Sequence, residues 1–223
     1  MKLAALFSGG KDSVFAILKA KQEAHEIKYL ATIHSKNPDS YMYHTPNIGL
    51  TLLQSEAMNI QLVSKESKGE KEKEVEDLKI LLDGLDIEGV VCGAIASNYQ
   101  KQRIEEVCKQ LNLKSLTPLW GIDQEKLLRE IINNNFEIII TAVAAEGFDE
   151  SWLGKKIDEK CIEELIELKE KYRINIAGEG GEFETVVLDC PLFTRKILIT
   201  DVEKLWEKNS GIFRVINAKL VTK

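Results

Sequence analysis

Apolar and amphipathic segments alternate along the first 145 residues of the chain. Residues 3–7 and 137–145 have the continuous apolar pattern of strands that are buried on both faces. Residues 104–111 instead carry apolar side chains at i, i+3, i+4 and i+7, the spacing of one helix face. This alternation predicts an α/β fold, a parallel sheet with helices on both faces. In such a fold, ligands bind beyond the carboxyl ends of the strands.

Turn and capping residues give bounds for the other elements. Thr45-Pro46 combines a capping threonine with a proline at the first helical position, which predicts the start of a helix. The expected strands cover residues 3–7, 29–33, 60–63, 90–95 and 137–145, and the expected helices include 45–58, 70–82 and 123–133.

The pattern changes after residue 145. A predicted helix over residues 155–171 is followed by strand-like runs at 182–189, 196–200 and 213–221, which turns separate. These runs predict a smaller mixed α+β unit whose strands are partly antiparallel. We therefore expect two domains, residues 1–145 and residues 146–223. The run at 213–221 could also extend a sheet across a homodimer.

Composition narrows the class of protein. The 223 residues are 44% hydrophobic and 30% charged, which is typical of a folded globular protein and excludes a disordered chain. Its 30 basic and 36 acidic residues give a net charge of −6, so charge alone does not favour tight nucleic-acid binding. The four cysteines form no CxxC pair, which predicts no zinc site. Cys108 and Cys161 fall on apolar helix faces and Cys92 lies in an apolar run, which predicts buried thiols. Without a long apolar stretch or a signal peptide, we expect a cytoplasmic protein that does not bind membranes.

The most informative motif is the sequence SGGKDS at residues 8–13, directly between the first strand and a helix. Two glycines let the main chain approach a ligand closely, and the start of a helix supplies free N–H groups and a positive dipole end. Lys11 adds a mobile positive charge. These features suit a phosphate chain, although the motif matches neither a Walker A loop nor GxGxxG. The alternative is a simple turn with Asp12 as the N-cap, which leaves Lys11 and both serines unexplained.

Three further segments follow strands or are rich in glycine. DSYMYHT at 39–45 comes shortly after His34, where adenine or ribose would lie; the alternative is a polar loop with a helix cap. GAIASNYQ at 93–100 ends one strand and begins a helix, and the alternative is a tight turn. GEGGEFET at 178–185 places two glutamates on one strand face; the alternative is a glycine hairpin with solvated glutamates.

SGGKDS resembles the PP-loop of the N-type ATP pyrophosphatases, in the adenine nucleotide α-hydrolase superfamily. Together with the three segments, Arg103 and Pro118-Leu119-Trp120, it resembles the diphthine–ammonia ligase family over nearly the whole chain. The resemblance implies a ligase that uses ATP and Mg²⁺ to amidate diphthine on translation elongation factor 2. Ammonium would supply the nitrogen, an acyl-adenylate would form, and diphthamide, AMP and pyrophosphate would be released. Residues 1–145 would then bind ATP, and residues 146–223 would bind the substrate.

The resemblance and the chemistry of the motifs give the following candidate residues. Those expected to bind the nucleotide are Ser8, Gly9, Gly10, Lys11, Asp12, Ser13, His34, Gly93, Ala94 and Ser97. Those expected to bind the substrate are Tyr99, Gln100, Arg103, Trp120, Glu179, Gly180, Gly181, Glu182, Phe183 and Glu184. Asp12 is expected to hold Mg²⁺, and the expected catalytic residues are Lys11, Asp12, Glu182 and Glu184. Glutamates are suited to gather ammonium and then to accept its proton.

Diphthine also carries a trimethylammonium group, which aromatic faces attract. Tyr99, Trp120, Trp152 and Phe183 could form a cage for it, and the alternative for each is core packing. Two other functions stay open: a PP-loop enzyme that adenylates another substrate, as in tRNA modification, and a nucleotide-binding regulator without catalysis.

Overall fold

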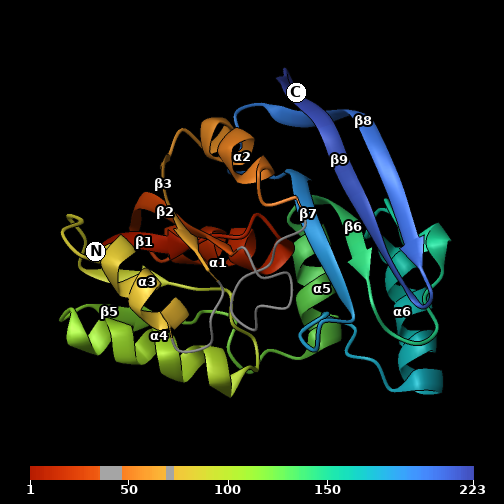
Figure 1. Cartoon of the computed structure of the whole chain (residues 1–223), viewed down its shortest axis with the longest axis horizontal. Coiled ribbons are helices and arrows are strands. Elements are labelled where there is room, and N and C mark those ends of the chain that lie inside the picture. Colours follow the sequence, from red (N-terminus) through yellow and green to blue (C-terminus); the bar gives the residue numbers. More distant parts are fainter. Residues whose placement is uncertain (36–46, 69–72) are drawn as a thin grey trace. The chain divides into compact units, whose positions relative to one another are not determined.

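The computed structural model describes residues 1–35, 47–68 and 73–223 (Figure 1). The chain forms two compact units, Met1–Trp120 and Gly121–Lys223. Among the described residues, no helix has both the length and the apolar character to span a membrane.

The first unit is built on a five-stranded sheet with the order β3-β2-β1-β4-β5. Every neighbouring pair in this sheet is parallel. Its strands are β1 (Lys2–Leu6), β2 (Glu26–Ser35), β3 (Gln61–Ser67), β4 (Gly89–Val91) and β5 (Lys114–Leu116). The chain therefore starts in the middle of the sheet, moves outward to β3, and returns to β4 on the other side of β1. The loops that follow β1 and β4 lie at the point where the strand order reverses, which is where open parallel sheets bind ligands.

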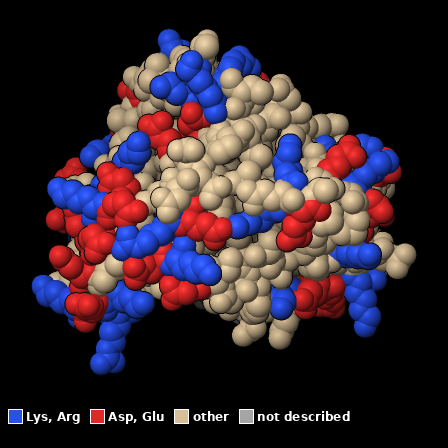
Figure 2. All heavy atoms as spheres, turned by 180° about the vertical axis from the view of Figure 1, so that it is seen from behind, with Lys and Arg blue, Asp and Glu red and all other residues tan. Residues whose placement is uncertain are grey.

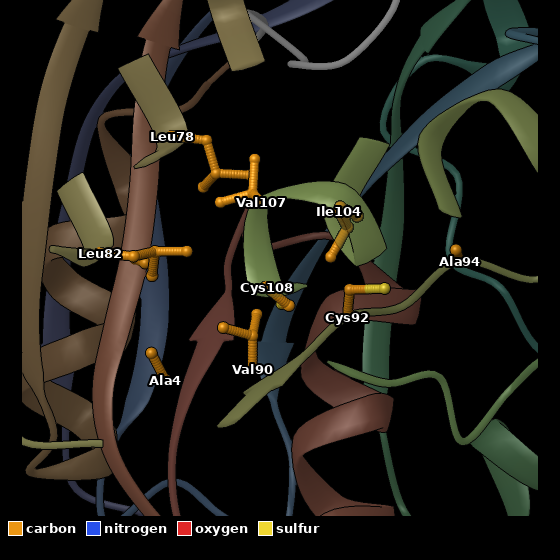
Figure 3. Close-up of a cluster of buried hydrophobic side chains, with 10 residues drawn as sticks. Ala4, Leu78, Leu82, Val90, Cys92, Ala94, Ile104, Val107 and Cys108 are labelled. Carbon is orange, nitrogen blue, oxygen red and sulfur yellow. The ribbon is translucent and has the colours of Figure 1, made fainter. Parts of the chain in front are cut away.

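Helices cover both faces of this sheet, as the sequence predicts. They are α1 (Lys11–Gln22), α2 (Leu50–Met58), α3 (Lys73–Leu82) and α4 (Asn98–Gln110). Figure 3 shows how Leu78 and Leu82 of α3 and Val107 of α4 meet Ala4 of β1 in one buried cluster. Because successive side chains of a strand point to opposite faces, the buried Leu3 and Ala5 lie on the other face, where α1 contacts the strands.

The second unit contains a four-stranded antiparallel sheet with the order β7-β6-β9-β8. Its strands are β6 (Glu137–Val143), β7 (Phe183–Asp189), β8 (Lys196–Glu207) and β9 (Ser210–Val221). Its helices are α5 (Gln124–Asn133) and α6 (Glu159–Tyr172), with the single turn η1 (Glu150–Trp152). Asp158 caps α6 by accepting a hydrogen bond from the backbone N–H of Cys161 at 2.9 Å, so this helix begins four residues later than expected.

Two sequence-based expectations about the second unit are wrong. The run at 137–145 was expected in the parallel sheet, but β6 is an interior strand of the antiparallel sheet. An interior strand is apolar on both faces in either kind of sheet, so hydropathy cannot distinguish the two. The boundary expected after residue 145 consequently falls earlier, after Trp120.

Other differences concern the ends of elements. The helix expected over residues 45–58 runs from Leu50 to Met58, and Thr45-Pro46 lies outside the described residues. The strand expected at 196–200 continues to Glu207, and β9 begins at Ser210. The two strands form a long hairpin that carries five exposed large apolar residues, namely Leu198, Val202, Leu205, Ile212 and Ile216.

The four cysteines are buried free thiols, as expected from their sequence context. Burial raises the pKa of Cys108 to about 11, and it raises the pKa values of Cys161 and Cys190 to about 12. Within the described residues, no group of three or more histidine, cysteine, aspartate or glutamate side chains could hold a metal ion.

Candidate functional site

The glycine turn directly follows the central strand β1. Gly9 has a φ of +78°, a conformation that residues with a Cβ rarely adopt, so glycine is required there. Gly10 is the N-cap of α1 and has no side chain with which to cap the helix. The hydroxyl of Ser13 donates to the carbonyl of Gly10 at 2.9 Å, and it lies 3.3 Å from the hydroxyl of Ser8. The N-terminus of α1 therefore presents backbone N–H groups beside two hydroxyls, an arrangement that favours an anion.

The charged residues of the turn form an ion pair. The ammonium Nζ of Lys11 lies 2.8 Å from Oδ2 of Asp12, and the Lys11 side chain is only 3% exposed. The alternative in which Asp12 caps the helix is wrong, because Gly10 occupies the N-cap. Lys11 is buried and held by Asp12, so it is less mobile than the sequence suggested. The ion pair places both a buried ammonium and a carboxylate beside the start of the helix.

Gly93 brings the end of β4 against the start of α1. A Cβ on Gly93 would lie 2.6 Å from the carbonyl carbon of Asp12 and 2.8 Å from the backbone nitrogen of Ser13. The structure therefore explains Gly93 by close backbone packing around the glycine turn. The next residue, Ala94, is buried and belongs to the cluster of Figure 3.

The first turn of α4 has local structural roles. The Ser97 side chain accepts a hydrogen bond from the backbone N–H of Gln100 at 3.4 Å, so Ser97 is the N-cap of α4. The guanidinium carbon of Arg103 lies 3.5 Å from the centroid of the Tyr99 ring, and Nζ of Lys101 lies 4.2 Å from that of Trp120. Both rings therefore attract cations that belong to the chain itself.

His34 lies near the carboxyl end of β2, opposite Glu66 of β3 in the strand register, and is partly buried. It thus lies at the same edge of the sheet as the glycine turn. The segment 39–45, for which we expected contacts with adenine or ribose, lies outside the described residues.

The second glycine-rich segment forms an ordered loop before β7. Both carboxylate oxygens of Glu182 accept backbone hydrogen bonds, from the N–H of Asn175 at 2.9 Å and from the N–H of Gly180 at 2.8 Å. Gly178 and Gly181 have φ values of +75° and +83°, so this turn depends on glycine. Glu182 therefore holds the loop together, a role that the sequence did not indicate.

The remaining residues of this loop differ in exposure. Glu179 and Glu184 are half-buried, while Gly180 and Gly181 are exposed. Phe183 is 3% exposed, and its ring centroid lies 6.0 Å from that of Phe148, which also packs edge-on against Trp152 at 4.9 Å. Phe183 and Trp152 thus pack in the core, which was the alternative to an aromatic cage.

Comparison with protein families matches both units. The sequence model of the diphthamide synthase N-terminal domain matches residues 1–115, and that of the diphthamide synthase C-terminal domain matches residues 123–221. The chain belongs to the diphthamide synthase family. The two matched ranges follow the two compact units, with a boundary near Trp120 in both cases.

Relatives in the diphthamide synthase family extend over most of the chain. The chain is 42% identical to the diphthine–ammonia ligase of Rattus norvegicus and 41% identical to that of Homo sapiens. Each alignment covers 91% of this chain and 84% of the relative. The diphthine–ammonia ligase of Schizosaccharomyces pombe is 37% identical over all of this chain and 40% of its own length.

One solved structure, described as a predicted subunit of a tRNA methyltransferase from Methanocaldococcus jannaschii, aligns with 86% of this chain and 98% of its own. The sequence identity is 17% and the TM-score is 0.47, so this likeness does not bear on function.

In this diphthamide synthase, Gln54 of α2 also belongs to the glycine turn, although the sequence analysis did not single it out. Its side chain is fully buried, and Nε2 donates a hydrogen bond to the carbonyl of Gly9 at 2.9 Å. The available signal was a large polar residue within the apolar sequence of α2. That signal could not identify its partner, which lies 45 residues earlier in the chain.

The residues of the turn can hold a magnesium ion only if phosphates supply further ligands. Asp12 supplies one carboxylate, and its side chain is 28% exposed. Proteins commonly hold Mg²⁺ with one or two carboxylates while substrate phosphates and water complete the octahedron. A lone carboxylate next to a phosphate-binding turn matches that donor set, whereas a cage made of protein groups alone does not.

Proposed function

We propose that this chain is an ATP-dependent diphthine–ammonia ligase, which amidates diphthine on translation elongation factor 2 with ammonium and releases AMP and pyrophosphate. The observation that carries the proposal is the glycine turn at the point of strand reversal, with Lys11 buried beside it, in a chain that belongs to the diphthamide synthase family. Elongation factor 2 acts in translation, so we also propose a cytoplasmic location.

The glycine turn is suited to hold the β- and γ-phosphates of ATP. The backbone N–H groups at the start of α1 and the hydroxyls of Ser8 and Ser13 would bind phosphate oxygens. Lys11 would neutralise the pyrophosphate as it leaves, because a fixed cation away from bulk water stabilises developing negative charge strongly. Asp12 would hold Mg²⁺, which would offset the negative charge of the phosphates.

The division of ATP at the α-phosphate follows from the chemistry of the substrate. A carboxylate is a poor electrophile, and ammonia cannot displace oxide from it. Attack of the carboxylate on the α-phosphorus forms an acyl-adenylate and releases pyrophosphate. Ammonia then attacks the acyl carbon, the amide forms, and AMP leaves with one oxygen of the original carboxylate.

We propose that the glutamate loop of the second unit receives diphthine and ammonium. Ammonium must lose a proton before it can attack, so a carboxylate is needed as the base. The carboxylate of Glu182 holds the loop through two backbone hydrogen bonds, and we propose Glu179 or Glu184, the half-buried glutamates of the same loop, as the proton acceptor. The substrate contacts assigned to Tyr99, Arg103, Trp120 and Phe183 remain predictions.

A homodimer is a further proposal. The run at 213–221, which we expected to extend a sheet across the dimer, lies in β9 and pairs with β8. Strand β8 is the edge of the sheet, and Leu198, Val202 and Leu205 along it are exposed. An edge strand with apolar side chains is a template for pairing with another strand. Light scattering on the purified protein should give twice the mass of one chain, and a monomer mass would contradict the proposal.

Product analysis tests the proposed reaction. Protein with Mg-ATP should release AMP and pyrophosphate only when both ammonium and elongation factor bearing diphthine are present. Lys11→Met should abolish the release, whereas Lys19→Met, which removes a lysine from the last turn of the same helix, should leave it unchanged. Release of ADP, or of AMP in response to tRNA, would contradict the proposal. On the face shown in Figure 2, basic and acidic side chains are interspersed, which does not favour a tRNA substrate.

A further inference from the structure

The peptide between Gly9 and Gly10 lies in the phosphate-binding turn, directly before the first residue of α1. Neither residue has a Cβ, and Gly9 has a φ of +78° while Gly10 has a φ of −77°. Glycine enters positive and negative φ about equally readily, so steric hindrance alone does not fix the direction in which this peptide faces. A specific contact is therefore needed to select one orientation.

Gln54 supplies such a contact from outside the turn. Its Nε2 donates to the carbonyl of Gly9 at 2.9 Å, and both groups are buried. Packing reinforces the hydrogen bond, because a Cβ on Gly9 would lie 2.1 Å from Oε1 of Gln54 and 3.0 Å from its Cδ. The amide group of Gln54 thus lies directly against Gly9 and holds its carbonyl.

The same hydrogen bond helps to set the direction of the N–H group of Gly10, which itself donates to the hydroxyl oxygen of Ser8 at 3.4 Å. The described residues contain no cis peptide bond, and in a trans peptide the C=O and N–H groups point in opposite directions. Holding the carbonyl of Gly9 toward Gln54 therefore directs the N–H of Gly10 to the opposite side. Gly10 is the N-cap of α1, where N–H groups are suited to bind an anion.

We propose that Gln54 is a positioning residue, which keeps the Gly9–Gly10 peptide in the orientation that binds the terminal phosphates of ATP. The inference rests on the proposed function, because it requires this turn to bind those phosphates. Gln54 does not touch the nucleotide in this proposal. It acts through the carbonyl of Gly9.

Two substitutions at this position differ in what they do to the peptide. Gln54→Leu removes the donor and leaves both orientations of the peptide accessible. Gln54→Glu keeps the size of the side chain but replaces the donor with a carboxylate, which repels the Gly9 carbonyl. A carboxylate can also accept a hydrogen bond from the N–H of Gly10 in a flipped peptide, so it stabilises the wrong orientation. The glutamate variant should therefore be the weaker of the two in ATP binding.

Calorimetric titration with Mg-ATP and with AMP tests the inference, because AMP lacks the terminal phosphates. Loss of the hydrogen bond in Gln54→Leu should weaken ATP binding about tenfold, while AMP binding changes less than about twofold. Gln54→Glu should weaken ATP binding further at about pH 8 and partly recover, relative to wild type, at about pH 6, where a buried carboxyl regains its proton and can donate. Ser55→Ala is the matched control, because the Ser55 hydroxyl bonds to the Leu52 carbonyl within α2.

Each outcome is informative. The ratio of ATP to AMP affinity is measured within each variant, so partial loss of folded protein does not alter it, and Gln54→Leu alone is sufficient for the test. Unchanged ATP affinity in the variants, or an equal loss for ATP and AMP, would overturn the role of Gln54 and leave the proposed function intact. Failure of the wild-type protein to bind Mg-ATP would overturn the proposed function, and this inference with it.

Discussion

Gly93→Ala is the substitution for which the structure gives the sharpest expectation. The added methyl group would lie 2.6 Å from the carbonyl carbon of Asp12, 2.7 Å from its carbonyl oxygen and 2.8 Å from the nitrogen of Ser13. All three atoms belong to the backbone of the first turn of α1, so none can rotate away. The end of β4 and the start of α1 must therefore move apart.

The size of that movement follows from the distances. Ordinary van der Waals contact begins near 3.4 Å, so an atom at 2.6 Å must retreat by a further 0.8 Å. Overpacking of this kind costs about 1–3 kcal/mol of stability. The displaced atoms carry the phosphate-binding turn, and a misplacement of about 1 Å can lower a catalytic rate about 100-fold. We therefore expect kcat to fall by a factor of about 10 to 100.

The assay is pyrophosphate release at saturating substrates, together with thermal unfolding and the dissociation constant for Mg-ATP. Gly49→Ala is the matched control, because a Cβ on Gly49 has no atom within 4 Å and its φ of −60° suits alanine. It should leave kcat within about twofold of wild type. Wild-type kcat and ATP affinity in Gly93→Ala would refute the reasoning, since the turn would then tolerate displacement.

Two further predictions concern the second unit and the buried thiols. Glu182→Gln leaves one backbone N–H of the loop facing an amide donor and should lower stability by about 1–3 kcal/mol; an unchanged melting temperature would contradict the loop role. Glu184→Gln should lower the rate of amidation, and an unchanged rate would contradict its role as the base. The thiols of Cys108, Cys161 and Cys190 have pKa values of about 11 to 12 when folded, against 9.0 for an exposed thiol, because burial disfavours the thiolate. Their contribution to the free energy of unfolding is therefore complete below about pH 9 and is lost as the pH rises toward 12. Denaturant titrations over that range should show a smaller pH dependence in Cys161→Ala; an unchanged slope would contradict it.

Much of the first unit could be predicted from hydropathy and turn residues. The alternation of apolar runs with amphipathic segments identified the parallel sheet and its helices, because each βα connection is short and local. The strand at 137–145 was placed in the wrong sheet for a physical reason. Its partners, β7 and β9, lie about 40 to 80 residues later in the chain, and its own residues do not encode which strands pair with it.

Site residues that are neighbours in the sequence could be predicted, whereas site residues that reach the turn from distant segments could not. Residues 8–13 form one continuous turn, so their order alone indicated a phosphate site. Gln54 reaches that turn from α2, and Gly93 reaches it from the end of β4, so both contacts depend on the tertiary structure. Glu182 was expected to act as a base because it is a glutamate in a glycine-rich loop, but its two backbone hydrogen bonds become visible only in the folded loop.

The central claim is that the diphthine carboxylate is activated by transfer of the adenylyl group. Diphthine labelled with ¹⁸O in its carboxylate tests this directly when one turnover with Mg-ATP and ammonium is analysed by mass spectrometry. The account predicts one ¹⁸O atom in the phosphate of AMP and the other in the amide of the product. Label recovered in inorganic phosphate, or AMP without ¹⁸O, would contradict it.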